Sequence, residues 1–117
     1  MAVVLYVEDH PPARMLMQAI VGEMTPHQLT VAGSGEEARA MVAKFAPDLY
    51  IIDIDLPDTD GITLADTLTA LHAAPVLLVS AYAESIKEPA TKSPIAAYLA
   101  KPLDPTDVAR IIQRTLA

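Results

Sequence analysis

The residues best suited to chemistry stand at the ends of short apolar runs. Asp53 follows the run 49–52, and the pair Glu8-Asp9 follows the run 2–7. A carboxylate at the end of a buried strand can serve as a nucleophile, as a metal ligand, or as both. An isolated aspartate in such a place more often caps a helix or forms a turn. The role of Asp53 therefore depends on its neighbours in the fold.

Two more apolar runs end near polar side chains. Ser80 follows the run 75–79, and Lys101 comes shortly after the run 96–99. The carboxyl ends of parallel strands lie at one edge of a sheet, so both side chains are expected to converge there with the three acids. When several carboxylates lie close together, keeping all of them ionised costs free energy unless a cation lies between them. Hard oxygen ligands that leave room for water suit Mg²⁺, so the pattern indicates a magnesium site.

Helix-length segments separate the apolar runs, and 29–32 is one further short run of strand type. Pro11-Pro12 and Asp104-Pro105 are typical helix openings, and Ser34 is a plausible helix cap. Four segments carry an apolar stripe at helical spacing. The residues predicted to face inward are Met15, Leu16, Ala19, Ile20 and Met24; Ala38, Val42 and Phe45; Leu64, Leu68 and Leu71; and Val108, Ile111, Ile112 and Leu116.

The segment 84–93 has the weakest helical pattern. Pro89 falls in its middle, where proline breaks or kinks a helix. We expect a short, irregular fourth helix there. Five strands that alternate with helices require an α/β fold with a parallel sheet and right-handed crossovers.

The composition narrows the function classes. At 117 residues the chain is long enough for one domain with a single core, and its 52% hydrophobic residues include no Trp and one Phe. A net charge of −7 argues against direct nucleic-acid binding, which needs a basic face. The chain has no cysteine, which suits a cytoplasmic location. The first apolar run is too short for a signal peptide or a membrane span, so nothing points to a membrane.

These motifs, in this order and spacing, resemble the receiver domain of two-component response regulators. The matching segments are Val7-Glu8-Asp9, Ile51-Ile52-Asp53 with Leu56-Pro57 and Asp60-Gly61, Ser80-Ala81, and Tyr98-Leu99-Ala100-Lys101-Pro102. The resemblance covers essentially residues 1–117 as one receiver domain. It implies a flavodoxin-like (βα)5 doubly wound sandwich with a five-stranded parallel sheet of order 2-1-3-4-5.

The resemblance also implies roles for the acidic residues. Asp53 would accept a phosphoryl group from a partner's phosphohistidine. Glu8 and Asp9 would hold Mg²⁺ together with Asp53, and the backbone carbonyl of Asp55 would add a ligand. The domain would then catalyse only its own phosphorylation and dephosphorylation and would not be a turnover enzyme.

The remaining roles concern the response to phosphorylation. Lys101 would pair with one phosphoryl oxygen, and the Ser80 hydroxyl would bond another. Movement of Ser80 would make room for Tyr98 to turn inward, which would couple the site to the face formed by the helix at 84–93, the strand at 96–99 and the last helix.

The resemblance implies a partner of a particular chemistry. A sensor histidine kinase or a histidine phosphotransfer protein would supply the phosphoryl group. The resemblance is compatible with an output domain, fused or separate, and with a homodimer. His10 stands where the family often has a third acid, and the segment 93–97 lacks the glycine that commonly precedes the fifth strand. Asp58 and Asp60 are expected to form a turn beside Gly61, which can take a positive φ.

Two alternatives start from the same residues. Asp53-Ile54-Asp55 also resembles the Asp-x-Asp of haloacid-dehalogenase-type phosphatases, in which a Ser or Thr and a Lys follow on later strands. That family needs a downstream acidic pair, whereas Glu8-Asp9 lies upstream, and it usually has a longer chain with a cap. The second alternative is a docking-only pseudo-receiver, against which the intact set of acids, Ser80 and Lys101 argues.

Overall fold

One parallel sheet forms the centre of the protein. The computed structural model describes residues 1–81 and 95–117. Within them the strands are β1 (Val3–Val7), β2 (Gln28–Ala32), β3 (Leu49–Asp53), β4 (Val76–Ser80) and β5 (Ile95–Ala100). They pair in parallel in the order β2-β1-β3-β4-β5. This order confirms the predicted sheet.

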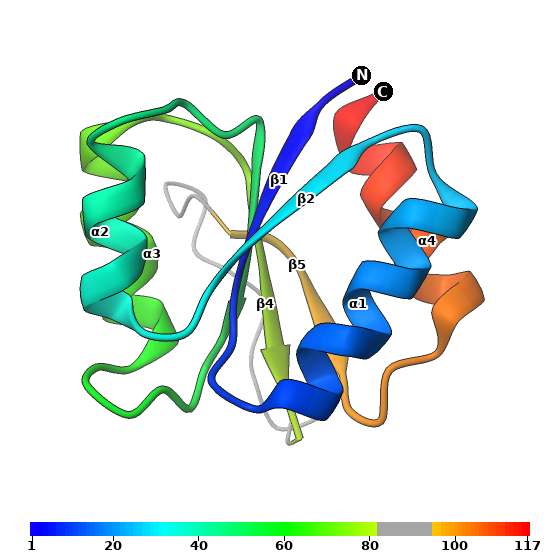
Figure 1. The fold of residues 1–117 in the computed structure, drawn as a ribbon, viewed down its shortest axis with the longest axis horizontal. Helices are drawn as coiled ribbons and strands as arrows, with labels where there is room; N and C mark the ends of the chain where they lie inside the picture. Colours follow the sequence, from blue (N-terminus) through cyan, green and yellow to red (C-terminus); the bar gives the residue numbers. More distant parts are fainter. Residues whose placement is uncertain (82–94) are drawn as a thin grey trace.

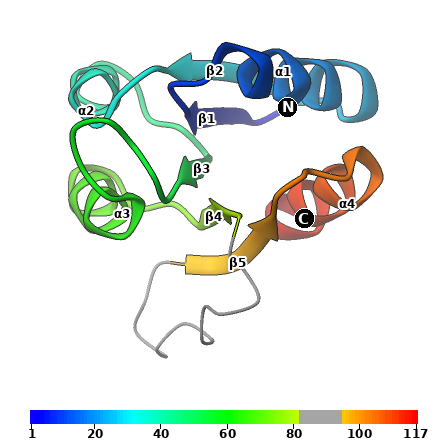
Figure 2. The same cartoon turned by 90° about the horizontal axis from the view of Figure 1, so that it is seen from below.

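Helices cover both faces of the sheet. They are α1 (Pro11–Met24), α2 (Gly35–Val42), α3 (Gly61–Leu71) and α4 (Pro105–Leu116). Figures 1 and 2 show α1 and α4 on one face and α2 and α3 on the other. The doubly wound, flavodoxin-like arrangement is therefore as expected. The predicted irregular helix at 84–93, with Pro89, lies outside the described residues.

Polar side chains fix where three of the helices begin. Ser34 Oγ accepts the backbone N–H of Glu37 at the start of α2. Asp104 accepts the N–H groups of the first turn of α4, which confirms both predicted caps. Asp60 Oδ1 accepts the Thr63 N–H at 2.8 Å and so caps α3. These bonds satisfy N–H groups that have no partner inside the helix.

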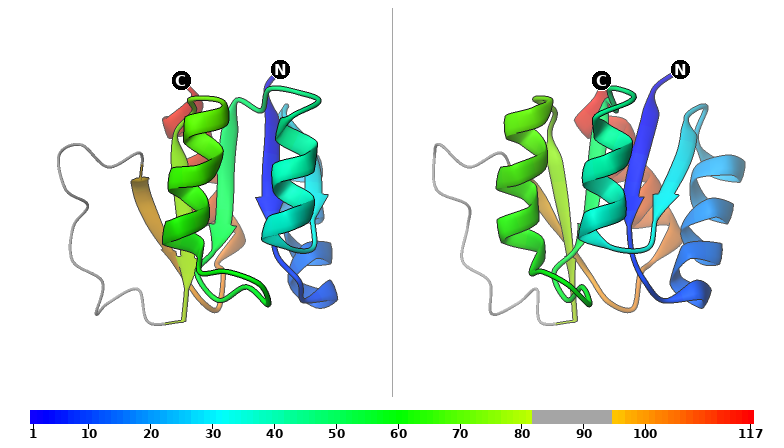
Figure 3. Two further views of the ribbon diagram at one scale, coloured as in Figure 1. Left: turned by 90° about the vertical axis from the view of Figure 1, so that its left-hand side faces the viewer. Right: turned by 60° about the vertical axis from the view of Figure 1, so that its left-hand side comes forward.

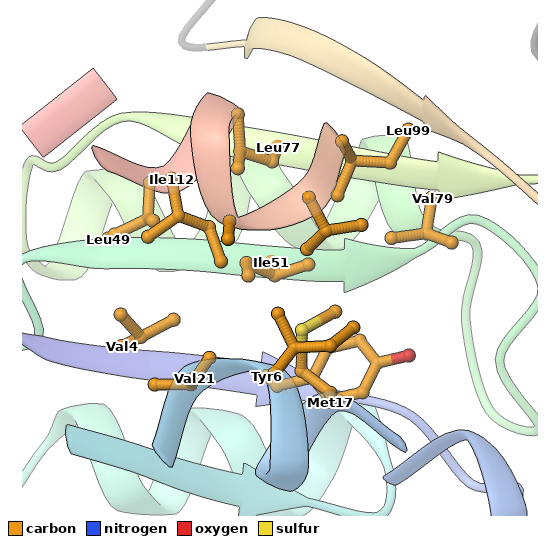
Figure 4. Packing of buried hydrophobic residues seen from close by; sticks show 13 residues of the cluster. Val4, Tyr6, Met17, Val21, Leu49, Ile51, Leu77, Val79, Leu99 and Ile112 are labelled. Carbon is orange, nitrogen blue, oxygen red and sulfur yellow. The ribbon is translucent and has the colours of Figure 1, made fainter. Parts of the chain in front are cut away.

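Alternate residues of the central strands β1, β3 and β4 enter different core clusters. Val4 and Tyr6 of β1 pack with α1 and α4, as Figure 4 shows, whereas Leu5 and Val7 pack on the α2–α3 face. The same alternation puts Ile51 of β3 on the α1–α4 face. Two residues further along each strand stand Glu8 and Asp53. The pleat thus directs both acids to the same side of the sheet.

The predicted buried face of α1 is largely wrong. Its buried residues are Met17, Ile20 and Val21, whereas the side chains of Met15 and Leu16 are 68% and 38% exposed. The segment contains two overlapping apolar stripes, and its pattern does not choose between them. The short connection from β1 and the packing against β1 set the rotation of the helix. The prediction that Leu71 faces inward is also wrong, since this residue at the end of α3 is 56% exposed.

Candidate functional site

The carboxyl edge of the sheet gathers the polar side chains that the sequence singles out. Figure 3 shows the strand arrows pointing to one edge, from which β1 leads into α1 and β3 into the loop before α3. In the part of the chain that the structure describes, the buried polar or charged residues are Glu8, Asp53 and Ser80. All three stand at this edge. Burial of a charged group is costly unless it is paired, so this concentration marks a functional site.

Lys101 joins the two buried acids. Its Nζ lies 2.6 Å from Asp53 Oδ2 and 3.2 Å from Glu8 Oε1. The lysine is one-third exposed, so the ammonium closes the site from the solvent side. Burial lowers the pKa of Lys101, but its bonds and charge interactions with Asp53 and Glu8 outweigh this and raise that pKa overall.

Glu8 is the member of the group whose negative charge is least favoured by its surroundings. Burial, followed by the neighbouring Asp53, raises the pKa of Glu8 from 4.5 to about 7, although Lys101 acts in the opposite direction. Two buried carboxylates thus share one ammonium, which leaves a net negative charge at the site when both are ionised. Such an excess of negative charge among hard oxygen donors fits a divalent cation.

A buried hydroxyl also faces Glu8. Tyr6 Oη donates to Glu8 Oε1 at 3.3 Å, and Figure 4 shows the Tyr6 oxygen pointing toward the carboxyl end of the strands. Burial, with the charges of Glu8 and Asp53, raises the pKa of Tyr6 well above its usual range. Tyr6 therefore acts as a neutral donor. This contact is not evident from the sequence, because Tyr6 is one more apolar residue of a buried strand.

The loop after β3 folds back on Asp53. The N–H of Asp55 donates to Asp53 Oδ1 at 2.9 Å. The backbones of Asp55 and Asp60 also pair across the loop as an isolated antiparallel β-bridge. A Cβ atom at Gly61 would lie 2.5 Å from the carbonyl oxygen of Asp53. Glycine is therefore required by a close approach to the Asp53 backbone. The expected positive φ is wrong, since no glycine of the described residues has one.

Asp58 does more than form the predicted turn. Its two carboxylate oxygens accept the N–H groups of Gly35 and Glu36 at the start of α2, each at 2.9 Å. These two bonds hold the pKa of Asp58 below its usual range. No local signal could have predicted the contact, because the partners are 22 and 23 residues away.

The other predicted residues lie near this group. Asp9 is exposed beside Glu8, and the described residues contain no set of three Asp, Glu, His or Cys side chains arranged for a metal ion. Ser80 is buried at the end of β4, and its carbonyl accepts the Lys101 N–H. Tyr98 is half-buried in β5, where it packs against the α2–α3 core cluster and lines a groove beside α4.

Fold and site together define a doubly wound α/β protein with an acidic, lysine-closed site at the carboxyl edge of its sheet. The family model for the response regulator receiver domain matches residues 4–113, and the chain belongs to that family. It is a receiver domain of two-component response regulators, and this family is a family of signalling domains. The match does not favour the phosphatase alternative.

Individual relatives agree with the family. The chain is 31% identical over 111 residues to the transcriptional regulatory protein PdtaR of Mycobacterium tuberculosis, covering 94% of this chain and 54% of PdtaR. It thus spans about half the length of curated relatives such as this one. No helix in the described part of the chain is both long and apolar enough to cross a membrane.

Solved structures match the fold closely. A CheY-like receiver domain from Methylobacillus flagellatus superposes with a TM-score of 0.87 at 26% identity, covering 98% of each chain. The response regulator TrrA of Thermotoga maritima has a TM-score of 0.86 at 24% identity, covering 99% of this chain and 100% of that one. TrrA was solved in complex with Mg²⁺ and BeF. Binding of Mg²⁺ thus occurs within the family.

Proposed function

We propose that Asp53 is the phosphoacceptor of this receiver domain, which residues 1–117 form as a unit. The observation that carries the proposal is the convergence of Asp53, Glu8 and Ser80, the buried polar residues of the described chain, with the ammonium of Lys101. Residues that only stabilised the fold would not need to gather at one edge of the sheet.

The transfer itself needs little from the protein beyond positioning and charge. A carboxylate oxygen of Asp53 attacks the phosphorus of a partner's phosphohistidine, the P–N bond breaks, and its electron pair stays on the imidazole nitrogen. The product is an acyl phosphate on Asp53. Lys101, already 2.6 Å from Asp53, is placed to pair with an oxygen of the transferred group.

Glu8, Asp9 and Asp53 would hold Mg²⁺ through their side chains, and Asp55 through its backbone carbonyl. The pKa of Glu8, raised by burial and then by the neighbouring Asp53, supports this proposal, because a bound cation would stabilise the ionised form of Glu8. When bound, the ion neutralises the charge that otherwise opposes attack of a carboxylate on an anionic phosphoryl group.

Phosphorylation would act through Ser80 and Tyr98. It replaces the single negative charge of the ionised Asp53 carboxylate with about 1.5 to 2 negative charges on the phosphoryl group. A near-complete switch requires about 5.5 kcal/mol, whereas one hydrogen bond to a charged group contributes about 1.5 to 3 kcal/mol. Ser80 alone is therefore insufficient, and Lys101 must contribute. The face of β5 and α4, with the segment before β5, would carry the response to an output domain, a homodimer partner, or both.

The proposal is tested by exposing the protein to acetyl phosphate with Mg²⁺ and measuring intact mass. We expect one added phosphoryl group that is stable in acid and lost in base. Asp53→Asn should abolish the label, and Asp66→Asn, a matched change at an exposed position of α3, should retain it. An undiminished label on Asp53→Asn would refute the assignment. Continuous turnover of the donor would instead indicate a phosphatase, and no reaction a docking module.

The partners follow from this chemistry. A sensor histidine kinase or a histidine phosphotransfer protein would donate the phosphoryl group. A cytoplasmic location belongs to the same proposal. Transfer from a purified phosphorylated kinase domain to Asp53, and its loss in Asp53→Asn, would test the class of donor directly.

A further inference from the structure

Asp58 connects two elements that are distant in sequence. It stands in the loop 54–60 between β3 and α3, and its carboxylate binds two N–H groups at the start of α2. The side chain is exposed, so no core packing holds it there. The two hydrogen bonds tie this part of the loop to the helix, while Leu56 of the same loop packs against the α2–α3 core cluster.

The backbone of α2 is shaped for this contact. A Cβ atom at Gly35 would lie 2.7 Å from Thr59 Cγ2 and 3.3 Å from Asp58 Oδ1. Contact at 2.7 Å would force Thr59 to shift. Glycine at this position therefore lets the loop lie directly against the first turn of α2.

The other part of the same loop touches the proposed phosphoacceptor. Asp55 donates its N–H to Asp53 Oδ1, and Gly61 donates its N–H to the carbonyl of Ile54 at 2.9 Å. Displacement of the loop at Asp58 would thus be felt at the backbone of Asp55. That backbone supplies the carbonyl proposed as a Mg²⁺ ligand.

We propose that Asp58 is a positioning residue that clamps the loop 54–60 onto α2 and so sets the backbone of Asp55 against Asp53. The inference rests on the proposed function for its effect on Mg²⁺, but the clamp itself is independent of it. Asp58 is not needed merely to cap α2, because Ser34 already accepts an N–H at that end.

The experiment compares Asp58→Ala with Ser34→Ala. Both remove a cap from the same helix end, but only the first releases the loop. Hydrogen exchange without metal should become faster at the N–H groups of Asp55 and Gly61 in Asp58→Ala and stay unchanged in Ser34→Ala. Calorimetric titration should show Mg²⁺ binding weakened about 10-fold in Asp58→Ala only, the size usual for residues that orient metal ligands.

A second pair of variants approaches the contact from the helix. Gly35→Ala should displace Thr59 and weaken Mg²⁺ binding in the same direction, although alanine favours helix. Gly33→Ala is the matched control, since its Cβ would meet only the ends of the Arg14 and Glu37 side chains, at 3.3 and 3.5 Å. Should Asp58→Ala not fold, Asp58→Asn, which keeps one acceptor oxygen, must show the same effects at smaller size.

The outcomes separate the clamp from the function. Equal effects of Asp58→Ala and Ser34→Ala on exchange at Asp55 would overturn the clamp. Faster exchange at Asp55 without any change in Mg²⁺ affinity would overturn its positioning role. Failure of the unaltered protein to bind Mg²⁺ would count against the proposed function, whereas the exchange result would still decide the clamp.

Discussion

Glu8 and Asp58 are two acids at the same edge of the sheet with opposite electrostatic surroundings. Glu8 is buried beside a second carboxylate, and its pKa is raised to about 7. Asp58 is exposed, accepts two backbone N–H groups, and has a lowered pKa. The two positions differ in what surrounds the same functional group. Burial and like charge make Glu8 responsive to cations, whereas helix N–H groups make Asp58 a fixed structural anion.

The difference divides the edge into two parts with separate tasks. The part formed by Glu8, Asp53 and Lys101 carries unbalanced charge and can respond to a cation or a phosphoryl group. In the part formed by Asp58, Asp60 and Gly61, the carboxylates accept backbone N–H groups and the Thr63 hydroxyl, and these bonds hold the loop in place. A site that must bind and release charge benefits from a scaffold that does not respond to it.

The largest expected effect is a fall in stability with rising pH that comes from Glu8. Its folded pKa of about 7 lies above its ordinary value of 4.5, so the folded state binds more protons than the unfolded state in that interval. Stability should therefore decrease as pH rises from 4.5 to 7, by about 3 kcal/mol at about 1.4 kcal/mol per pH unit. Denaturant unfolding with a chelator present measures this slope.

Two variants sharpen the comparison. Glu8→Gln should remove the decrease and be more stable than the unaltered protein at pH 8. Asp58→Asn should keep it, because the lowered pKa of Asp58 acts in the opposite sense and in a different window. That acid contributes stability above its ordinary pKa of 3.8, which is lost as pH falls below that value. Parallel curves for Glu8→Gln and the unaltered protein would show that Glu8 is not the responsible group.

A smaller loss of stability is expected when the ammonium of Lys101 is removed. Lys101→Met keeps the aliphatic stem but leaves Glu8 and Asp53 facing each other without a cation. Breaking a fully buried pair costs about 3 to 5 kcal/mol, and the one-third exposure of Lys101 reduces this to about 2 kcal/mol at pH 8. At pH 5 the loss should be smaller, because Glu8 takes up a proton. Unfolding at both pH values measures the effect.

The exposed Lys44 offers the control for this change. Lys44→Met alters the net charge by the same amount and should leave stability unchanged at both pH values. If both variants lost stability equally, net charge and not the local pairing would be the cause.

The sheet and the main site were predictable because both follow from strand pattern. The apolar runs and the polar residues at their ends carry the family resemblance, and the resemblance predicts the strand order. Parallel strands then bring Asp53 and Lys101 together at one edge, although the two residues are 48 positions apart in sequence. The roles of these residues stay predictions: Asp53 as phosphoacceptor, Lys101 as its partner, Glu8, Asp9 and Asp55 as metal ligands, and Ser80 and Tyr98 as switch residues. The rotation of α1 was not predictable, because two apolar stripes overlap and only packing selects Met17 over Met15.

The contacts made by Asp58 and Tyr6 could not be predicted for a related reason. Each depends on a partner whose position is set by the tertiary fold and not by the local sequence. Asp58 meets α2 because the β3–α3 loop crosses the edge of the sheet. Tyr6 meets Glu8 because alternate residues of β1 share a face, and an apolar run hides which of its members carries a useful hydroxyl.

The smallest expected effect separates a hydroxyl at the site from one elsewhere in the core. Tyr6→Phe removes the donor to Glu8 Oε1, and Tyr50→Phe removes one that serves the carbonyls of Leu68 and His72 at 3.1 and 2.7 Å. Each buried hydrogen bond contributes about 1 kcal/mol, so both variants should lose similar stability in denaturant unfolding. Only Tyr6→Phe should also weaken Mg²⁺ binding, because Glu8 loses a partner that orients its carboxylate. Equal Mg²⁺ affinity in the two variants would show that Tyr6 only stabilises the fold. The part of the edge that responds to a cation would then consist of Glu8, Asp53 and Lys101 alone.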